Sequence, residues 1–156
     1  MAVQDYFEAE LGLEQFILEY AQFAGPHVNL AIIYRQDGRD DEAKAALDQA
    51  LSIAPDHPAA HNELGILYRE QGEFDQAESA YRRAIEADPG YELAYYNLGV
   101  LLDLYLSRQA EALEFYQRYQ DLADEPDVQV SRWIIDLRRR LGITDQTASI
   151  AAEDGT

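Results

Sequence analysis

Residues 58–91 read PAAHNELGILYREQGEFDQAESAYRRAIEADPGY, and this stretch decides the fold. Its apolar and small residues recur three and four positions apart in two runs, which is the spacing of amphipathic helices. Gly72 separates the runs and Pro89 follows the second. Glycine permits a tight turn, and proline cannot continue a helix interior. The stretch therefore predicts two antiparallel helices joined by a short turn.

The side chains of the predicted pair differ in size in a way that favours close packing. Gly65 leaves room for the second helix to approach the first, because glycine has no side chain. On the first helix, Leu64, Leu67 and Tyr68 share one face. The second helix carries a stripe of small and large residues at Ala77, Ala80, Tyr81 and Ala84. Such alternation lets two helices interlock.

The same pattern occurs 34 residues upstream. The recurring pairs are His27 and His61, Leu30 and Leu64, Tyr34 and Tyr68, Gly38 and Gly72, Ala43 and Ala77, Ala50 and Ala84, and Pro55 and Pro89. Residues 24–57 and 58–91 are therefore two complete repeats. One helix pair cannot cover its own apolar face, so repeats of this kind stack on one another.

A third copy at residues 92–125 is less regular. Tyr95–Gly99 begins in register, but Leu102 stands where the first two copies have tyrosine. Ala112 and Tyr116 come one residue later than the period requires. We predict a one-residue insertion near Tyr105–Arg108 that lengthens the first helix of this pair.

The flanks predict further helices. Residues 1–23 contain an amphipathic helix over 5–23, either a half repeat or a helix that packs on the first pair; its apolar side carries Leu13, Phe16, Ile17, Tyr20 and Phe23. Residues 126–142 predict a capping helix, with Val130, Trp133, Ile134, Leu137 and Leu141 as its apolar stripe. Residues 143–156 lack periodicity and predict a flexible acidic tail.

Composition excludes several classes of function. The 30 acidic and 12 basic residues give a net charge of −18, which repels nucleic-acid backbones. There is no cysteine, so thiolate metal sites and thiol nucleophiles are excluded. No apolar run is long enough to span a membrane. We expect a cytoplasmic protein, or a periplasmic or membrane-anchored one if an export signal has been removed.

Residues 24–125 resemble the tetratricopeptide repeat family. The resemblance is carried by His61, Leu64-Gly65, Tyr68, Gly72, Ala77, Tyr81, Ala84-Ile85 and Pro89, together with their copies. The C-terminal helix is similar to the terminal helix of bacterial proteins of this class. The resemblance implies an all-α, right-handed superhelical solenoid whose concave groove binds peptides or helices of other proteins. His27 and His61 replace the usual tryptophan, and Ala31 replaces the usual glycine.

One subtype of the family is disfavoured by the residues present. Chaperone-binding members hold a carboxylate terminus with lysine and arginine from the first helices. The matching positions here are Val28, Val100 and Leu104. Apolar side chains cannot bind a carboxylate.

The resemblance places the groove on the exposed side of each first helix. Mapped onto this chain, the groove residues are Val28, Asn29, Ile32, Arg35, Asn62, Glu63, Ile66, Arg69, Tyr96, Asn97, Val100 and Asp103. Ile32, Ile66 and Val100 recur at 34 and predict an apolar ribbon. We expect Asn29, Asn62 and Asn97 to bind a partner's backbone, and Arg35 and Arg69 to pair with its acidic residues. The expected ligand is amphipathic.

Other polar residues are better explained without chemistry. His57 and His61 have the spacing of a helical metal pair, but Pro58 places His57 in the preceding loop. Glu70, Glu73 and Asp75 are expected to be surface charges. Arg138, Arg139 and Arg140 stand where a helix C-terminus favours cations. We predict no catalytic, cofactor or metal site.

The sequence thus favours a non-enzymatic module that binds a peptide or helix of a partner protein. A structural unit that self-assembles through its flanking helices is the alternative.

Overall fold

The computed structural model describes residues 3–143, and every regular element in that range is helical. The helices are α1 (Val3–Glu19), α2 (Ala24–Gln36), α3 (Asp40–Ile53), α4 (Pro58–Glu70), α5 (Phe74–Ala87), α6 (Glu92–Val100), the π-helix η1 (Leu101–Tyr105), α7 (Gln109–Leu122) and α8 (Val128–Arg140). The predicted all-α fold is confirmed. Most of the predicted acidic tail lies outside the described residues.

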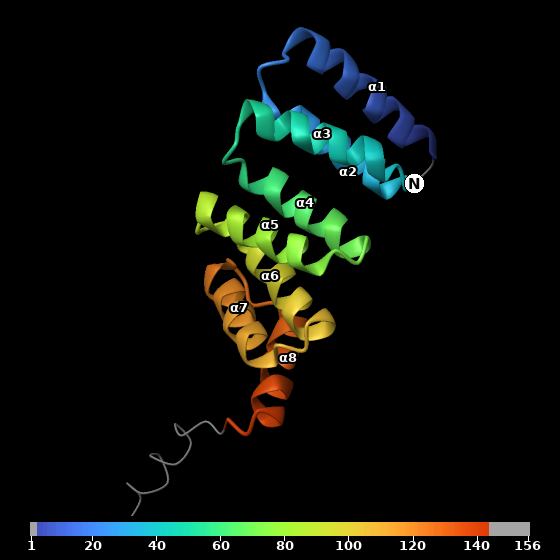
Figure 1. Ribbon diagram of the computed structural model, residues 1–156. Coiled ribbons are helices and arrows are strands. Elements are labelled where there is room, and N and C mark those ends of the chain that lie inside the picture. The colour runs from blue at the N-terminus through green and yellow to red at the C-terminus, as the bar shows by residue number, and fades with distance from the viewer. Residues whose placement is uncertain (1–2, 144–156) are drawn as a thin grey trace, which may run out of the picture.

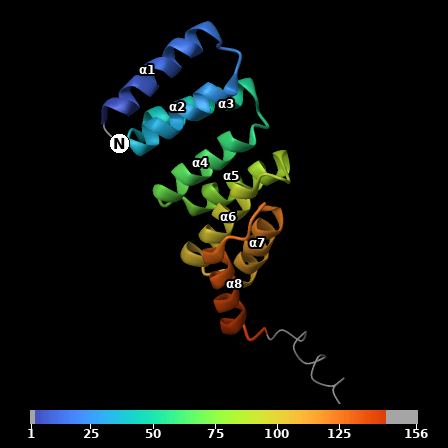
Figure 2. The ribbon, with the colours of Figure 1, turned by 180° about the vertical axis from the view of Figure 1, so that it is seen from behind.

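The helices stack in one direction. α2 with α3, α4 with α5, and α6 with α7 form three antiparallel pairs, and each pair packs on the next. α1 lies against α2 at one end of the stack, and α8 lies against α7 at the other (Figures 1 and 2). Because each pair contacts only its neighbours, the fold is a helical solenoid.

The pairs differ in the residues that meet between their two helices. A Cβ atom placed on Gly65 would lie 2.5 Å from the ring of Tyr81, and one on Gly99 would lie 2.7 Å from the ring of Tyr116. In the first pair the residues equivalent to Gly65 and Tyr81 are Ala31 and Leu47, and Ala31 is buried. A larger residue on the first helix is thus matched by a smaller one on the second.

Each of the three turns between paired helices contains one residue with a positive φ angle. Gly38 and Gly72 adopt positive φ angles of 72° and 78°, which glycine reaches at no steric cost. In the third pair Ser107 takes the same conformation with φ 55°.

The third pair holds one more residue than the others. The amide of Arg39 donates to the carbonyl of Tyr34, five residues back, whereas the amide of Arg108 donates to Leu102, six back. The extra residue lies in η1, where the amide of Leu106 donates to the carbonyl of Leu101. A π turn absorbs one residue without ending a helix, and it begins earlier than the segment Tyr105–Arg108 where the sequence placed the insertion.

The first flanking helix is shorter than the sequence predicts. α1 ends at Glu19, so Tyr20 and Phe23 lie beyond it and are exposed. The expected helix over 5–23 was wrong at this end. Pro26 falls in the first turn of α2, where proline is tolerated, and it would have been in the interior of a continuous helix.

Candidate functional site

The first helices of the three pairs lie next to one another: α2 contacts α4, and α4 contacts α6. We call the side of these helices that carries the predicted groove residues the first-helix face. Asn29 on this face is exposed. Ile32, Ile66 and Val100, one on each helix at equivalent positions, are half-buried. The face therefore offers partly accessible apolar groups in series.

Several residues expected to be exposed on this face are buried. The exposed fractions are 4% for Val28, 1% for Asn62 and 8% for Asn97. The expectation of exposure was wrong for these three because successive first helices pack against one another along part of this side. A stack of helices buries the residues that point at the neighbouring repeat.

Asn62 and Asn97 bind each other. The Asn97 Nδ2 donates to the Asn62 Oδ1 at 2.9 Å, and this hydrogen bond joins α4 to α6. Buried amides of this kind are costly unless paired. The two side chains therefore stabilise the stack, and the expectation that they would hold a partner's backbone is not supported by their position.

Arg35 also forms its ion pairs within the protein. Its guanidinium donates to Glu63 at 3.2 Å and to Glu70 at 3.0 Å, which ties α2 to α4. The side chains of Arg35 and Glu63 are only 17% and 14% exposed. The expected pairing of Arg35 with an acidic ligand would have to break this network.

Burial dominates the titration of Glu63. It raises the pKa of this carboxyl, and the attraction of Arg35 offsets only part of that effect. A carboxylate that is out of water is stable mainly because a cation is beside it. Glu63 and Arg35 are thus best regarded as one internal pair.

Arg69, the copy of Arg35 in the second repeat, is in a different situation. Arg35 pairs with Glu63 and Glu70 of the following repeat. The corresponding residues in the repeat that follows Arg69 are Asn97 and Leu104. Asparagine and leucine are uncharged, so neither can form an ion pair with arginine. Arg69 has no ion-pair partner in the part of the chain that the structure describes. The face therefore carries a half-buried cation at the step from α4 to α6.

Apolar groups surround this step. Ile66 and Val100 occupy the ribbon positions of α4 and α6, and Leu104 lies one turn further along in η1 with 69% of its surface exposed. Sequence reasoning named Leu104 only as a place where a basic residue was missing. The equivalent residues of the first two repeats, Gln36 and Glu70, are also exposed, but only the third repeat has an apolar residue at this place.

The last part of the predicted face lies against α8. The ring of Tyr96 stacks on Trp133 with centroids 6.2 Å apart and contacts Tyr119 at 5.3 Å. Burial raises the pKa of Asp103, which also accepts a hydrogen bond from Tyr116 and feels the charge of Arg140. Tyr96 and Asp103 are therefore adjacent to the end of the stack.

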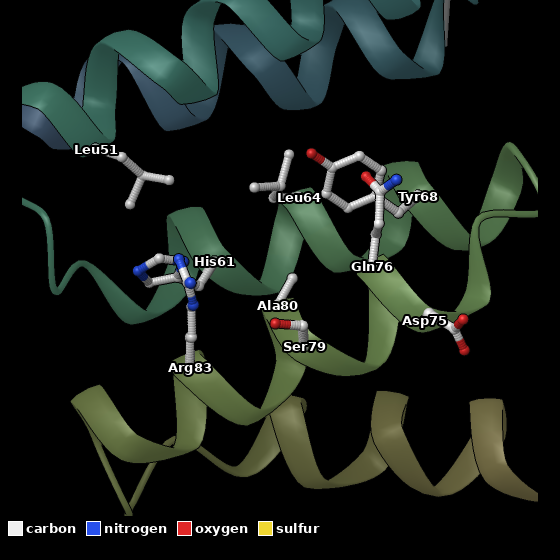
Figure 3. A pocket seen from close by; sticks show the side chains of 9 residues that line it. All are labelled: Leu51, His61, Leu64, Tyr68, Asp75, Gln76, Ser79, Ala80 and Arg83. Atoms are coloured by element: carbon white, nitrogen blue, oxygen red, sulfur yellow. The ribbon is translucent and has the colours of Figure 1, made fainter.

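A pocket of about 320 Å³ lies on the other side of the helix pairs, and sequence reasoning missed it. Figure 3 shows side chains of α4 and α5 facing Leu51 of α3 across this space. Its floor includes Leu64 and Ala80, and its rim includes Arg83. A second pocket, of about 510 Å³, occupies the equivalent place between α1, α2 and α3. Because it recurs, the pocket is a consequence of how the repeats stack.

The two histidines that resemble a metal pair have structural contacts. The Nδ1 of His57 accepts a hydrogen bond from the amide of Ala60 and so caps α4. The Nε2 of His61 lies 2.7 Å from the carbonyl oxygen of Pro55. No group of three or more metal-ligating side chains occurs among residues 3–143. Nor is any helix in this range long and apolar enough to cross a membrane.

Comparisons with known proteins agree with the repeat structure. Two family models, both described as tetratricopeptide repeat, match residues 22–90 and 62–126. The chain therefore belongs to the tetratricopeptide repeat family, whose fold is known as a module for protein–protein interaction. No curated protein sequence matches the chain.

Solved structures show the same fold at low sequence identity. A crystal structure of MamA is 19% identical with a TM-score of 0.73, and the match covers 92% of this chain and 86% of that one. YrrB, described as a protein with an unusual peptide-binding site, is 23% identical with a TM-score of 0.73, covering 84% of this chain and 66% of that one. The first repeat domain of Spaghetti (RPAP3), bound to the HSP90 peptide SRMEEVD, is 21% identical with a TM-score of 0.70, covering 78% and 97%.

Proposed function

We propose that the chain binds a short segment of a partner protein on the first-helix face, at the step from α4 to α6, and that it acts by binding and not by catalysis. The observation that carries this proposal is Arg69, which is half-buried and has no carboxylate partner among residues 3–143. A cation in such a place gains most from an acidic group supplied from outside.

The partner segment is amphipathic. Its apolar side chains contact Ile66, Val100 and Leu104, and one acidic residue pairs with Arg69. The remainder of the segment carries basic residues, because the chain as a whole has a net charge of −18 and attracts positive partners over long range. The binding of an HSP90 peptide by the RPAP3 domain does not carry over, since Val28, Val100 and Leu104 replace the basic groups expected of a carboxylate clamp.

A random peptide library displayed on phage tests this proposal. Peptides selected on the wild-type protein are expected to contain apolar residues with one acidic residue among them. Leu104→Asp and Arg69→Glu should each weaken their binding by at least tenfold, which corresponds to about 1.4 kcal/mol. Leu104 is exposed, so its substitution leaves the helix stack intact.

Arg83→Glu is the matched control, because Arg83 is exposed on α5 and lines the pocket on the other side. This variant should bind the selected peptides as the wild type does. Peptides that bind Leu104→Asp and Arg69→Glu at full affinity but lose affinity for Arg83→Glu would place the binding site in that pocket and refute the proposal.

A further inference from the structure

α1 occupies the place of a second helix in the solenoid. It ends at Glu19, and the second helices α3 and α5 end at Ile53 and Ala87, each 34 residues after the one before. Ile17 of α1 lines a pocket with α2 and α3 just as Leu51 of α3 lines one with α4 and α5. α1 therefore packs on α2 as α3 packs on α4, but no first helix precedes it in the part of the chain that the structure describes.

The side of α1 that would receive a first helix is open. In α3 this side carries Ala43, Ala46 and Ala50, which are 1%, 8% and 0% exposed because α2 covers them. The equivalent residues of α1 are Ala9, Gly12 and Phe16, and all three are exposed. A Cβ atom added at Gly12 would meet nothing within 4 Å. We call these three residues the open side of α1.

α8 occupies the place of a first helix at the other end. It has 13 residues, as α2 and α4 have, and it begins after the capping residue Asp127. Its third and tenth residues, Val130 and Leu137, are 0% and 2% exposed. The third and tenth residues of α4, Ala60 and Leu67, are both 0% exposed. α8 thus stacks on the third pair as the first helix of a fourth, and residues 3–143 contain no second helix to follow it.

The open side of α8 carries two exposed apolar residues. Val128 and Ile135 lie two turns apart on one face and are 64% and 66% exposed. Ile135 stands at the eighth position of the helix, where α4 has Gly65 and receives the side chain of its second helix. In α1 the residue equivalent to Tyr81 is Leu13, so a pair of α8 with α1 would bring the apolar side chains of Ile135 and Leu13 together.

The two ends carry opposite charge. α1 contains the carboxylates Asp5, Glu8, Glu10, Glu14 and Glu19 and no basic residue. α8 contains four of the chain's 12 basic residues, Arg132, Arg138, Arg139 and Arg140, and one acidic residue, Asp136. In an antiparallel pair the arginine-rich C-terminal end of α8 would lie beside the first turns of α1, near Glu8.

We propose that a second copy of this chain covers these ends: α8 of one molecule packs on the open side of α1 of the next and completes a helix pair across the interface. Exposed apolar residues at both ends, Phe16 on α1 and Ile135 on α8, together with opposite charge, select α8 as the occupant. The contact is head-to-tail, so each added molecule leaves one open end and assembly continues beyond a dimer.

Sedimentation velocity across a range of protein concentrations tests the proposal. The wild-type chain of 17.7 kDa should form a series of integer multiples as concentration rises, and salt should weaken the series because the facing charges are screened. Ile135→Glu blocks the α8 end and Phe16→Glu blocks the α1 end. Each variant alone should remain at 17.7 kDa.

An equimolar mixture of the two variants distinguishes head-to-tail contact from other modes. Each variant keeps the end that the other lacks, so the mixture should form a species of twice 17.7 kDa and none larger. Leu18→Glu is the control on α1, since Leu18 is 86% exposed and lies away from the open side; this variant should associate as the wild type does. Leu104→Asp should also associate normally, which separates this proposal from binding at the first-helix face.

Three results would overturn the inference. A wild-type protein that remains at 17.7 kDa up to millimolar concentration has ends that a second copy does not cover. A single variant that still dimerises by itself indicates a symmetric contact of α1 with α1 or α8 with α8. A mixture that stays monomeric while the wild type assembles places the interface elsewhere. Circular dichroism of both variants should equal that of the wild type, because the substituted side chains are exposed.

Discussion

Gly65→Ala is a direct test of how the helix pairs are held together. The new Cβ atom would lie 2.5 Å from Cε1 and 2.6 Å from Cδ1 of Tyr81. Carbon atoms in contact are about 3.5–4.0 Å apart, so the ring or the helix has to move by about 1 Å. Tyr81 is 0% exposed and packed in the hydrophobic core together with Leu98 and Leu102, which leaves its ring little room to move.

The net effect is a difference between two terms. Alanine is favoured over glycine inside a helix by about 1 kcal/mol. Overpacking of a filled core costs about 1–3 kcal/mol, and the short contact at Gly65 places this substitution at the upper end. We therefore expect a loss of about 2 kcal/mol, which lowers Tm by about 4–8 °C in a chain of this size.

The first pair provides the compensating change, because it combines Ala31 with leucine at the place of Tyr81. In a Tyr81→Leu background, Gly65→Ala should become stabilising by up to about 1 kcal/mol, since the clash is gone and the helix propensity remains. Chemical denaturation of the four proteins in the cycle measures this coupling.

Gly25→Ala in α2 is the control, because nothing lies within 4 Å of its added Cβ atom, and it should not destabilise the protein. If Gly65→Ala costs the same with tyrosine and with leucine at position 81, contact with the ring does not determine the spacing of the pair, and the reasoning fails.

Three further substitutions have defined outcomes. Ser107→Gly should stabilise the protein by about 0.5–1 kcal/mol in urea denaturation. Ser107 has a positive φ angle, which costs free energy for a residue with a Cβ atom but not for glycine. A loss of stability would contradict this. Trp133→Ala should destabilise it by about 2–3 kcal/mol, less than for a fully buried ring, since Trp133 is half-buried against Tyr96 and Tyr116; unchanged melting would show that α8 is not a cap. The pKa of Glu78 is subject to burial, which raises it, but hydrogen bonds from Arg82 and Arg108 lower it overall. Its contribution to stability is therefore present above the unfolded pKa and lost as pH falls through the folded one, so Glu78→Gln should reduce the acid sensitivity of unfolding below about pH 5, and an unchanged pH profile would count against it.

The repeat pattern predicted the helix pairs because their packing is local. Gly72 in its turn recurs as Gly38, and the contact of Gly65 with Tyr81 recurs as that of Gly99 with Tyr116, because each is set by residues of one pair. Residues that point at the next repeat are not identified by such a pattern. Asn62 was expected to be exposed and is buried, because α6 of the next repeat packs on α4 and Asn97 binds the Asn62 side chain there.

The charges of the first-helix face show the same limit. Arg35 and Arg69 occupy the same position of the repeat, and the repeat pattern alone does not distinguish them. Their situations differ because each contacts the following repeat: Arg35 meets Glu63 and Glu70, whereas Arg69 is followed by Asn97 and Leu104. Two identical residues at the same repeat position can therefore have different contacts, because their partners lie in the following repeat.

The features proposed here for binding all lie where the repetition is broken. Where two complete repeats meet, as at α2 and α4, the ion pairs of Arg35 are satisfied within the protein. At the diverged third repeat the partners of Arg69 are replaced, and the exposed Leu104 stands where the second repeat has Glu70. At the two ends, α1 and α8 each lack the helix that would complete a pair within residues 3–143. Where the solenoid repeats regularly, neighbouring repeats cover each other's apolar residues and pair each other's charges. Where they do not, another molecule can gain free energy by binding. We therefore propose the diverged third repeat and the open sides of α1 and α8 as the places where other molecules bind this chain.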